Sequence, residues 1–377
     1  MTKKAILIRN AAASDFGGGE KVPVYIAREV SKHDIETVVF SSSKKLLDFA
    51  SIEHVKNKKT WWLPWQNWSG ARVILTPLYI VWQVVLFVYY LLLFIKFRPT
   101  IVHIQGKDDF IAGTIAAKSY GARVIWSDYA DLKHIWKNVT IWYKNPIGKM
   151  VLWASRFTDE VIVVSKEDLR LITANIPSHK ILKKMSVVYY GAFDNKMKSS
   201  KSSDDVTFIS TSRLVTDKGV GELIDAFQEL RKVHNTAQLL LVGDGPEREK
   251  FENKAKTIPG ITFTGLVVNP IEYLAKSDVF VLPTYHEGFS IALVEACMQG
   301  LPIIATRIGG NVEIIKDDYN GVLIPKEDVK SLFEAMKLLF EDSKLRKSFG
   351  ENARSVYEEE FDFKLIIEKE FVSRYSI

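Results

Sequence analysis

The sequence predicts an α/β protein made of two doubly wound parallel sheets, each in its own domain. Short apolar runs rich in β-branched residues alternate with helical patterns along the chain, which is typical of βαβ units. The length of 377 residues suits two domains, because each can then bury a substantial apolar core. The content of 47% hydrophobic and 25% charged residues excludes a wholly disordered or fibrous chain.

A polar stretch at residues 195–205 lacks apolar periodicity and is predicted to separate the two domains. The first domain, 1–195, has predicted strands at 5–9, 37–41, 101–105, 123–127, 160–165 and 186–190. The second domain, 205–360, has them at 206–210, 238–242, 261–264, 279–283, 302–306 and 321–325. The tail, 361–377, is expected to pack back on the first domain.

The net charge of +6 favours an anionic partner such as an acidic lipid headgroup or a phosphorylated substrate. No zinc spacing, Arg-rich arm or RNA-binding signature accompanies the charge, so nucleic acid is not expected as a partner. The single cysteine, Cys297, cannot form an internal disulfide, and the first ten residues lack the long apolar region of a secretory signal. Both features favour the cytoplasm.

The segment 61–97 is unusual, because a tryptophan cluster (WWLPWQNW) precedes the uncharged run 73–95. That run is long enough to cross a bilayer, but a span would divide one sheet between two compartments. Two alternatives remain, contact with one leaflet or burial in the core. Tryptophans suit the headgroup level, and the neighbouring lysines and arginines suit acidic lipids. We therefore expect a cytoplasmic protein attached peripherally to the inner face of the cell membrane.

The run EGFSIALVE, from Glu287 to Glu295, follows an apolar strand and carries the strongest chemical signal. Ser290 has the chemistry of a helix N-cap, so backbone N–H groups between Gly288 and Ile291 are expected to point outward and attract phosphate. A diphosphate there would leave a sugar near Glu287 and ribose hydroxyls near Glu295, which lies roughly 6 to 8 Å along the helix axis at 1.5 Å per residue.

Two cations, Arg213 and Lys218, follow the first strand of the second domain and are predicted to clamp the diphosphate. In the first domain, Gly18 and Gly19 belong to a Gly-rich turn that lets backbone approach a ligand closely. The turn does not match GxGxxG, so a nicotinamide-dependent enzyme is disfavoured. No DxD motif stands at a strand end, so no metal is expected, and no cofactor is expected beyond a nucleotide sugar as co-substrate.

Together these residues resemble the retaining glycosyltransferases of family 4, which have the GT-B fold of two facing Rossmann-like domains. The resemblance rests on the E-x7-E motif and is supported by the runs SRL, DKG, GDGP and FTGLV. It implies that Arg213, Lys218 and the backbone of 288–290, which includes Phe289, contact the donor diphosphate, and that Glu287 meets the sugar. It further implies that Glu295 holds ribose, that Leu266 and Val267 flank the base, and that Gly18 and Gly19 approach the donor or acceptor across the cleft.

The chain departs from the family pattern after the predicted strand 123–127. The family carries a His-Asp pair there, whereas this chain has Ser127 and Asp128, so Asp128 or His134 is the candidate for the sugar-side group. Glu287 and Asp128 are therefore the candidate catalytic residues. The family also implies retention without a protein nucleophile, with the leaving phosphate helping to deprotonate the acceptor.

We accordingly expect transfer of a hexose-type sugar from a UDP-sugar, or from GDP-mannose, to a lipid-linked or membrane-presented glycan in cell-surface polysaccharide synthesis. Two alternatives stay open. One is a catalytically weak nucleotide-sugar-binding or scaffolding partner of a membrane glycan assembly complex. The other is an enzyme of the same fold that epimerises or hydrolyses a nucleotide sugar.

Overall fold

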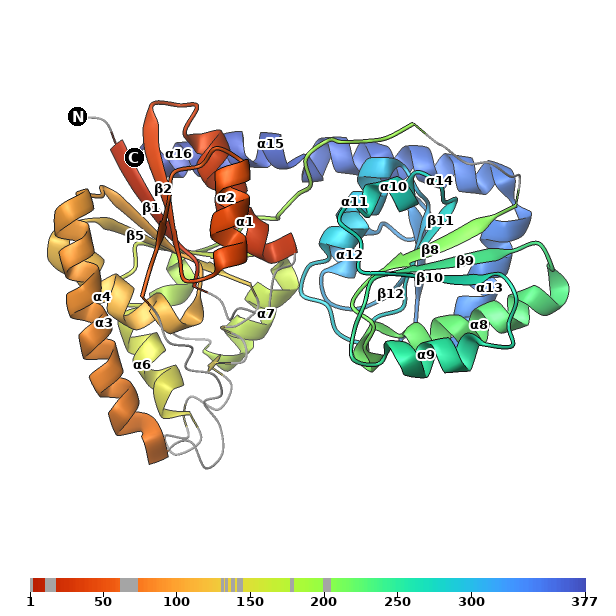
Figure 1. Cartoon of the computed structure of the whole chain (residues 1–377), viewed down its shortest axis with the longest axis horizontal. Helices are drawn as coiled ribbons and strands as arrows, with labels where there is room; N and C mark the ends of the chain where they lie inside the picture. The colour runs from red at the N-terminus through yellow and green to blue at the C-terminus, as the bar shows by residue number, and fades with distance from the viewer. Residues whose placement is uncertain are drawn as a thin grey trace. The chain divides into compact units, whose positions relative to one another are not determined.

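The computed structural model describes residues 3–10, 18–61, 74–129, 132, 135–136, 140, 145–176, 180–198 and 205–377. The chain forms two compact units, each with its own sheet (Figure 1). The first unit comprises Met1–Tyr190 together with Lys364–Ile377, and the second comprises Gly191–Phe363. The chain therefore passes from the first unit to the second slightly before the polar stretch 195–205, and it returns to the first unit near the start of the C-terminal tail.

The first unit contains a seven-stranded parallel sheet in the order β3-β2-β1-β4-β5-β6-β7. Its strands are β1 (Lys3–Ile8), β2 (Ile35–Ser41), β3 (Asn57–Lys59), β4 (Ile101–Ile104), β5 (Arg123–Asp128), β6 (Glu160–Val163) and β7 (Met185–Val187). The sequence order reverses between β1 and β4, which is where open α/β sheets form a crevice at their carboxyl ends. The sequence pattern missed β3, because this short polar strand forms only by pairing with β2.

Helices connect these strands and cover the sheet. They are α1 (Gly18–Val30), α2 (Lys44–Ile52), α3 (Thr76–Phe97), α4 (Phe110–Tyr120), α6 (Pro146–Ala154) and α7 (Lys166–Asn175). Because helices pack on the sheet, the central strand β4 is buried along its whole length.

The second unit contains a six-stranded parallel sheet in the order β10-β9-β8-β11-β12-β13. Its strands are β8 (Thr207–Thr211), β9 (Gln238–Val242), β10 (Ile261–Gly265), β11 (Val279–Leu282), β12 (Ile303–Thr306) and β13 (Gly321–Ile324). Its helices are α8 (Val220–Val233), α9 (Arg248–Ala255), α10 (Ile271–Leu274), α11 (Ile291–Gln299), α12 (Asn311–Ile314), α13 (Val329–Glu341) and α14 (Ser343–Val356). The order reverses between β8 and β11. The predicted pair of doubly wound α/β domains is thus confirmed.

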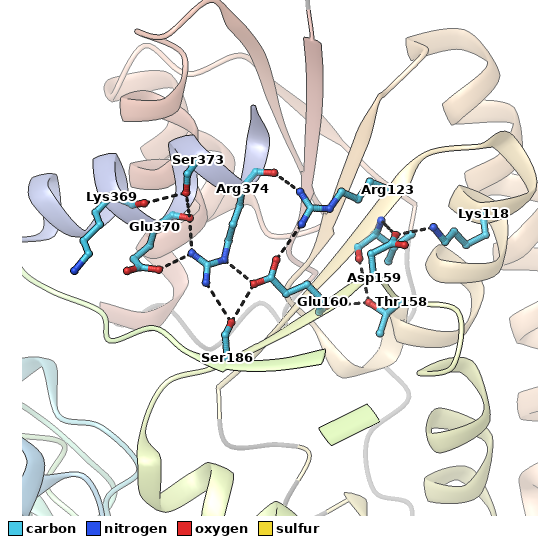
Figure 2. Close-up of polar contacts among 11 residues, drawn as sticks. Lys118, Arg123, Thr158, Asp159, Glu160, Ser186, Lys369, Glu370, Ser373 and Arg374 are labelled. Carbon is cyan, nitrogen blue, oxygen red and sulfur yellow. Dashed lines mark hydrogen bonds and ion pairs between the residues drawn. The ribbon is translucent and has the colours of Figure 1, made fainter. Parts of the chain in front are cut away.

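The C-terminal segment ends on the amino edge of the first sheet. It runs through η5 (Tyr357–Phe361), α15 (Phe363–Ile366), η6 (Ile367–Val372) and α16 (Ser373–Tyr375). Figure 2 shows the Arg374 guanidinium reaching Glu160, the first residue of β6, with a 2.7 Å Nε–Oε1 hydrogen bond. Arg123, the first residue of β5, donates to the same carboxylate at 3.2 Å and to the carbonyl of Arg374. These bonds fasten the last helix to strands β5 and β6.

His103 of β4 takes part in the same closure. Its ring is fully buried and contacts the Ser127 hydroxyl at 2.7 Å through Nε2 and the Tyr375 hydroxyl through Nδ1. Burial, with a smaller contribution from the nearby Arg374 charge, lowers the pKa of His103 to about 3. This histidine is therefore neutral at physiological pH and acts as a core residue beneath the tail.

The apolar segment singled out in the sequence forms α3, which is long and apolar enough to cross a membrane by length and composition. One face of α3 belongs to the core of the first unit and packs against α4. Its buried residues are Tyr79, Gln83, Leu86, Tyr90 and Phe94. The alternative of burial in the core therefore holds for one face of α3 only. Trp62, Trp65 and Trp68 lie outside the described residues.

Candidate functional site

The predicted donor site lies at the carboxyl ends of β8 and β11, the two strands between which the order of the second sheet reverses. Arg213 and Lys218 lie in the loop after β8, and Glu287 lies in the loop after β11. Open α/β sheets bind ligands where the strand order reverses, at the carboxyl ends of the strands on either side. The topology therefore brings together residues that are far apart in the sequence.

Glycines allow the loops after β8, β11 and β12 to approach one another closely. A Cβ on Gly219, which has a φ of +69°, would lie 2.0 Å from the carbonyl oxygen of Pro283. A Cβ on Gly309, which has a φ of +46°, would lie 1.8 Å from the carbonyl oxygen of Glu287. Both distances are far shorter than van der Waals contact, so any side chain at either position would push the loops apart.

Hydrogen bonds fix the position of the loop after β8 against the loop after β11. The Asp217 carbonyl accepts a hydrogen bond from the Tyr285 N–H at 2.8 Å and from the Thr284 hydroxyl at 3.0 Å. The Tyr285 hydroxyl donates to the Glu222 carboxylate in the first turn of α8. Burial, and then this hydrogen bond, raises the pKa of Tyr285 well above its ordinary value. These contacts hold residues 217 and 218 beside the start of the next loop.

The result is a direct ion pair between the Lys218 ammonium and the Glu287 carboxylate, with Nζ and Oε2 2.8 Å apart. The two side chains are only 23% and 17% exposed, so the pair is partly desolvated. Lys218 and Glu287 therefore face each other. An ammonium has three donors, so a pair of this kind leaves Lys218 able to bind a further anion.

Arg213 is exposed, and among the residues that the structure describes its guanidinium has no hydrogen-bond or ion-pair partner. Its five donors are therefore available to a ligand. The structure pairs Lys218 with Glu287 but pairs Arg213 with neither of them. The predicted clamp thus consists of one cation already held in place and one that is free to turn toward a phosphate.

Helix α11 begins immediately after Glu287, Gly288, Phe289 and Ser290. Ser290 is buried, and its hydroxyl accepts a hydrogen bond from the Leu293 N–H at 3.4 Å, as expected of an N-cap. The N–H groups of the first helical turn have no acceptor within the helix and give its start a partial positive charge. The Phe289 ring lies 5.8 Å from the buried ring of Phe361, which orients the loop at this helix start.

The residues predicted to hold the nucleoside also follow the carboxyl side of this sheet. Glu295 is half-buried in the second turn of α11. Leu266 and Val267 follow β10, and the Leu266 side chain is 84% exposed. An exposed leucine at a sheet's ligand-binding edge offers a surface for an aromatic base. The roles of these three residues in binding stay predictions.

Asp128, the candidate catalytic residue of the first unit, is the last residue of β5 and is fully buried. Its Oδ1 accepts a hydrogen bond from the Leu132 N–H at 2.9 Å. Gly18 and Gly19 open α1, and a Cβ on Gly19 would lie 3.7 Å from the Tyr129 ring, an ordinary contact. His134 lies outside the described residues.

Arg9, which follows β1 at the switch point of the first sheet, was not among the residues predicted from the sequence. Its guanidinium pairs with Glu20 of α1 at 3.0 Å and lies 4.5 Å from the centre of the Tyr129 ring. The Tyr129 hydroxyl donates to Gln105 at the end of β4, and burial raises the pKa of Tyr129 well above its ordinary value. The signal for Arg9 was its position at a strand end, which becomes informative only when the strand order is known.

Of the residues that the structure describes, no three histidine, cysteine, aspartate or glutamate side chains gather as a metal site. At the predicted donor site, positive charge comes from Arg213, Lys218 and the start of α11.

Comparison with known proteins gives two family matches. Residues 16–192 match the family described as Glycosyltransferase Family 4, and residues 192–356 match Glycosyl transferases group 1. Among curated relatives, the capsular polysaccharide biosynthesis glycosyltransferase CapM of Staphylococcus aureus is 25% identical over 230 residues, or 56% of this chain and 60% of CapM. The N-acetyl-alpha-D-glucosaminyl L-malate synthase of Bacillus anthracis is 34% identical over 177 residues, or 46% of each chain. The matches to these two relatives thus span less than two thirds of their length.

Among solved structures, HepE of Anabaena in complex with UDP superposes with a TM-score of 0.75 over 100% of both chains, at 17% identity. A sucrose-phosphate synthase of Thermosynechococcus elongatus superposes with a TM-score of 0.76 over 99% of this chain and 98% of its own, also at 17% identity. The architecture of the chain is therefore the GT-B fold.

Proposed function

The chain belongs to the GT-B glycosyltransferases, and we propose that it transfers a hexose-type sugar from a nucleotide diphosphate sugar, with retention of configuration. A UDP-sugar is the favoured donor and GDP-mannose the alternative. The complexes of HepE with UDP and with UDP-glucose support this choice, as does the complex of Staphylococcus aureus TarM with UDP. We propose a lipid-linked or membrane-presented glycan as the acceptor in cell-surface polysaccharide synthesis, which the name of CapM supports.

One observation carries this proposal: the 2.8 Å Lys218–Glu287 pair at the switch point of the second sheet, beside Arg213 and the start of α11. This arrangement places two cations and a helix terminus where α/β sheets bind ligands, with a carboxylate next to one of the cations. A diphosphate needs the cations, and a sugar attached to it can use the carboxylate as a hydrogen-bond acceptor.

In the proposed reaction the bond between the anomeric carbon and the phosphate oxygen breaks, and a bond from the acceptor oxygen to that carbon forms. Negative charge then develops on the leaving diphosphate, which Arg213 and Lys218 stabilise. The acceptor oxygen attacks on the face from which the diphosphate departs, so retention requires no protein nucleophile, and the acceptor's proton goes to the leaving phosphate. Glu287 positions the sugar hydroxyls, and Asp128 is the proposed sugar-side group of the first unit.

The test replaces Lys218 with methionine, which keeps much of the side-chain length and removes the charge. Lys254→Met is the matched control, because Lys254 of α9 forms a 2.7 Å pair with Asp225 of α8. Ligand bound only to the folded state raises the melting temperature. We expect UDP to raise it for the wild type and the control but not for Lys218→Met, and we expect Arg213→Ala to weaken the effect. An unchanged response to UDP in Lys218→Met would place the donor elsewhere.

Transfer from a panel of nucleotide sugars to lipid-linked acceptors completes the test. Donor binding without transfer to any acceptor would favour the scaffolding alternative, and donor turnover without an acceptor would favour an epimerase or hydrolase. We also propose that transfer needs no metal or cofactor, because Arg213, Lys218 and a helix start supply the positive charge. Transfer should then persist in excess chelator, and activity that magnesium or manganese restores would contradict this.

A further inference from the structure

We propose that α3 lies within one leaflet of an anionic membrane, parallel to its surface, with its outward face among the lipid chains. This inference rests on the proposed function and deepens it, because it names the surface through which the enzyme reaches a membrane-presented acceptor. The outward face consists of apolar side chains spaced three or four residues apart, namely Leu78, Val81, Val85, Val88, Leu92 and Ile95.

The outward face is exposed and uniformly apolar. Leu92 is 63% exposed and Val81 is 61% exposed, and the exposed side chains of Ile80 and Val84 widen the stripe. Between Leu78 and Ile95 no polar or charged side chain of α3 is exposed, since Gln83 is buried on the opposite face. A continuous exposed apolar surface of this kind marks a site of interaction with a partner or a membrane.

The opposite face of α3 is tied to the sheet by polar contacts, so the helix cannot leave the first unit to cross a bilayer. The Gln83 side-chain oxygen accepts a hydrogen bond from the Ala112 N–H at 3.1 Å. The Tyr90 hydroxyl donates to the buried Asp109 carboxylate at 2.6 Å and accepts from Asn10 at 3.0 Å. If these polar groups faced lipid, they would lose their hydrogen-bond partners in an apolar medium, which is energetically unfavourable. A helix held in this way can offer a membrane only its other face.

Two features favour lipid over a second protein as the occupant. Protein interfaces carry a polar rim around their apolar centre, which the exposed side chains of α3 between Leu78 and Ile95 do not supply. The C-terminal end of α3 carries cations instead: Lys96 and Arg98 are exposed, and the Lys58 ammonium of β3 lies 5.2 Å from the centre of the Phe97 ring. Cations beside an apolar helix face suit anionic headgroups.

Aromatic side chains lie beside the apolar face. Trp61 is 53% exposed, and its ring lies 5.0 Å from that of Trp82. The Tyr89 hydroxyl accepts a hydrogen bond from the Trp61 N–H at 3.1 Å. Tryptophan and tyrosine side chains are amphipathic and are enriched at the headgroup level. They would therefore flank an α3 that lies in the plane of the membrane.

The first experiment is flotation with vesicles of phosphatidylcholine and phosphatidylglycerol. We compare the wild type with the double variant Val88→Glu/Leu92→Glu on α3. The matched control is Val233→Glu/Leu338→Glu, because these residues of α8 and α13 are 56% and 44% exposed, against 49% and 63% for Val88 and Leu92. We expect the α3 variant to lose about a hundred-fold in partitioning and the control to behave like the wild type. Equal flotation of the two variants, or no flotation of the wild type, would overturn the inference.

A second experiment measures depth. Cys297 is the one cysteine of the chain and is buried, so labels introduced at Val81→Cys or Leu92→Cys are specific. Spin labels at these positions should show the same accessibility to oxygen and the same protection from a water-soluble nickel chelate when vesicles are present. Different depths at the two positions would instead indicate a spanning helix. A homodimer that Val88→Glu/Leu92→Glu converts to a monomer, without vesicle binding by the wild type, would assign the face to self-association.

The failure of this inference can be told apart from failure of the proposed function. The UDP-induced rise in melting temperature should be the same in the α3 variant as in the wild type, because the donor site lies in the second unit. Transfer to a water-soluble acceptor without vesicle binding would overturn the membrane inference alone. Vesicle binding without transfer to any acceptor would instead contradict the proposed function.

Discussion

Replacing Glu287 with glutamine should tighten UDP binding while it reduces sugar transfer. In the proposed complex the Glu287 carboxylate and a phosphate lie on either side of the Lys218 ammonium, and two anions placed so are about 5 Å apart. Their repulsion is about 1 kcal/mol in bulk water and about 3 kcal/mol at the dielectric constant of a protein surface. The 23% and 17% exposure of the two side chains puts this site between those limits.

Glutamine removes the repulsion but also the ion pair that holds the ammonium in place, which contributes up to about 1 kcal/mol. The net expectation is a gain of about 1 kcal/mol, or roughly fivefold tighter binding of UDP. Because the effect is electrostatic and the site is partly exposed, it should shrink as salt is raised. Transfer should fall by about a hundred-fold, because Glu287 would no longer orient the sugar as a charged acceptor.

Isothermal titration calorimetry with UDP at low and high salt measures this effect. Asp225→Asn is the control, because it removes the carboxylate partner of Lys254 in a more exposed pair with a similarly short contact of 2.7 Å. The reasoning is refuted if Glu287→Gln folds normally and binds UDP as the wild type does, or more weakly. Either result would mean that the phosphate does not lie beside Lys218.

Three further predictions concern stability. Gly219→Ala should lower the free energy of unfolding by about 2 kcal/mol or more and weaken UDP binding, because the new Cβ would clash with the Pro283 carbonyl. Gly221→Ala is the control and should cause no such loss in a urea titration, because the nearest atom to its Cβ would be 3.8 Å away. Arg374→Ala should lower the free energy of unfolding by about 3 kcal/mol, because it leaves the partly buried Glu160 without its tail partner. Arg170→Ala breaks an exposed pair and should have a far smaller effect, so comparable losses in the two variants would contradict this. Burial raises the pKa of Asp109 from 3.8 to about 6. The protonated carboxyl therefore contributes about 3 kcal/mol to the free energy of unfolding below pH 4, and this contribution is lost as the pH rises through 6. Asp109→Asn should flatten that slope in unfolding measured from pH 4 to 7, and an unchanged slope would exclude Asp109 as its source.

The alternation of strands and helices could be predicted from the sequence because buried parallel strands need continuous apolar runs, such as 279–282 and 303–306. The same pattern placed Glu287 and Arg213 at strand ends. It could not find β3, whose residues Asn57–Lys59 carry no apolar alternation and become a strand only through pairing with β2. Arg9 was missed for a related reason, since its position matters only because β1 neighbours β4.

The sequence by itself determined the fold class and the residue types of the candidate site, because burial and helix capping depend on local pattern. Only the tertiary structure decided that Lys218 pairs with Glu287, since that contact joins residues 69 positions apart across two glycine-dependent loops. It likewise decided that α3 is half core and half exposed. Hydropathy describes how apolar a helix is, whereas the side chains packed against it decide which face remains available to a membrane.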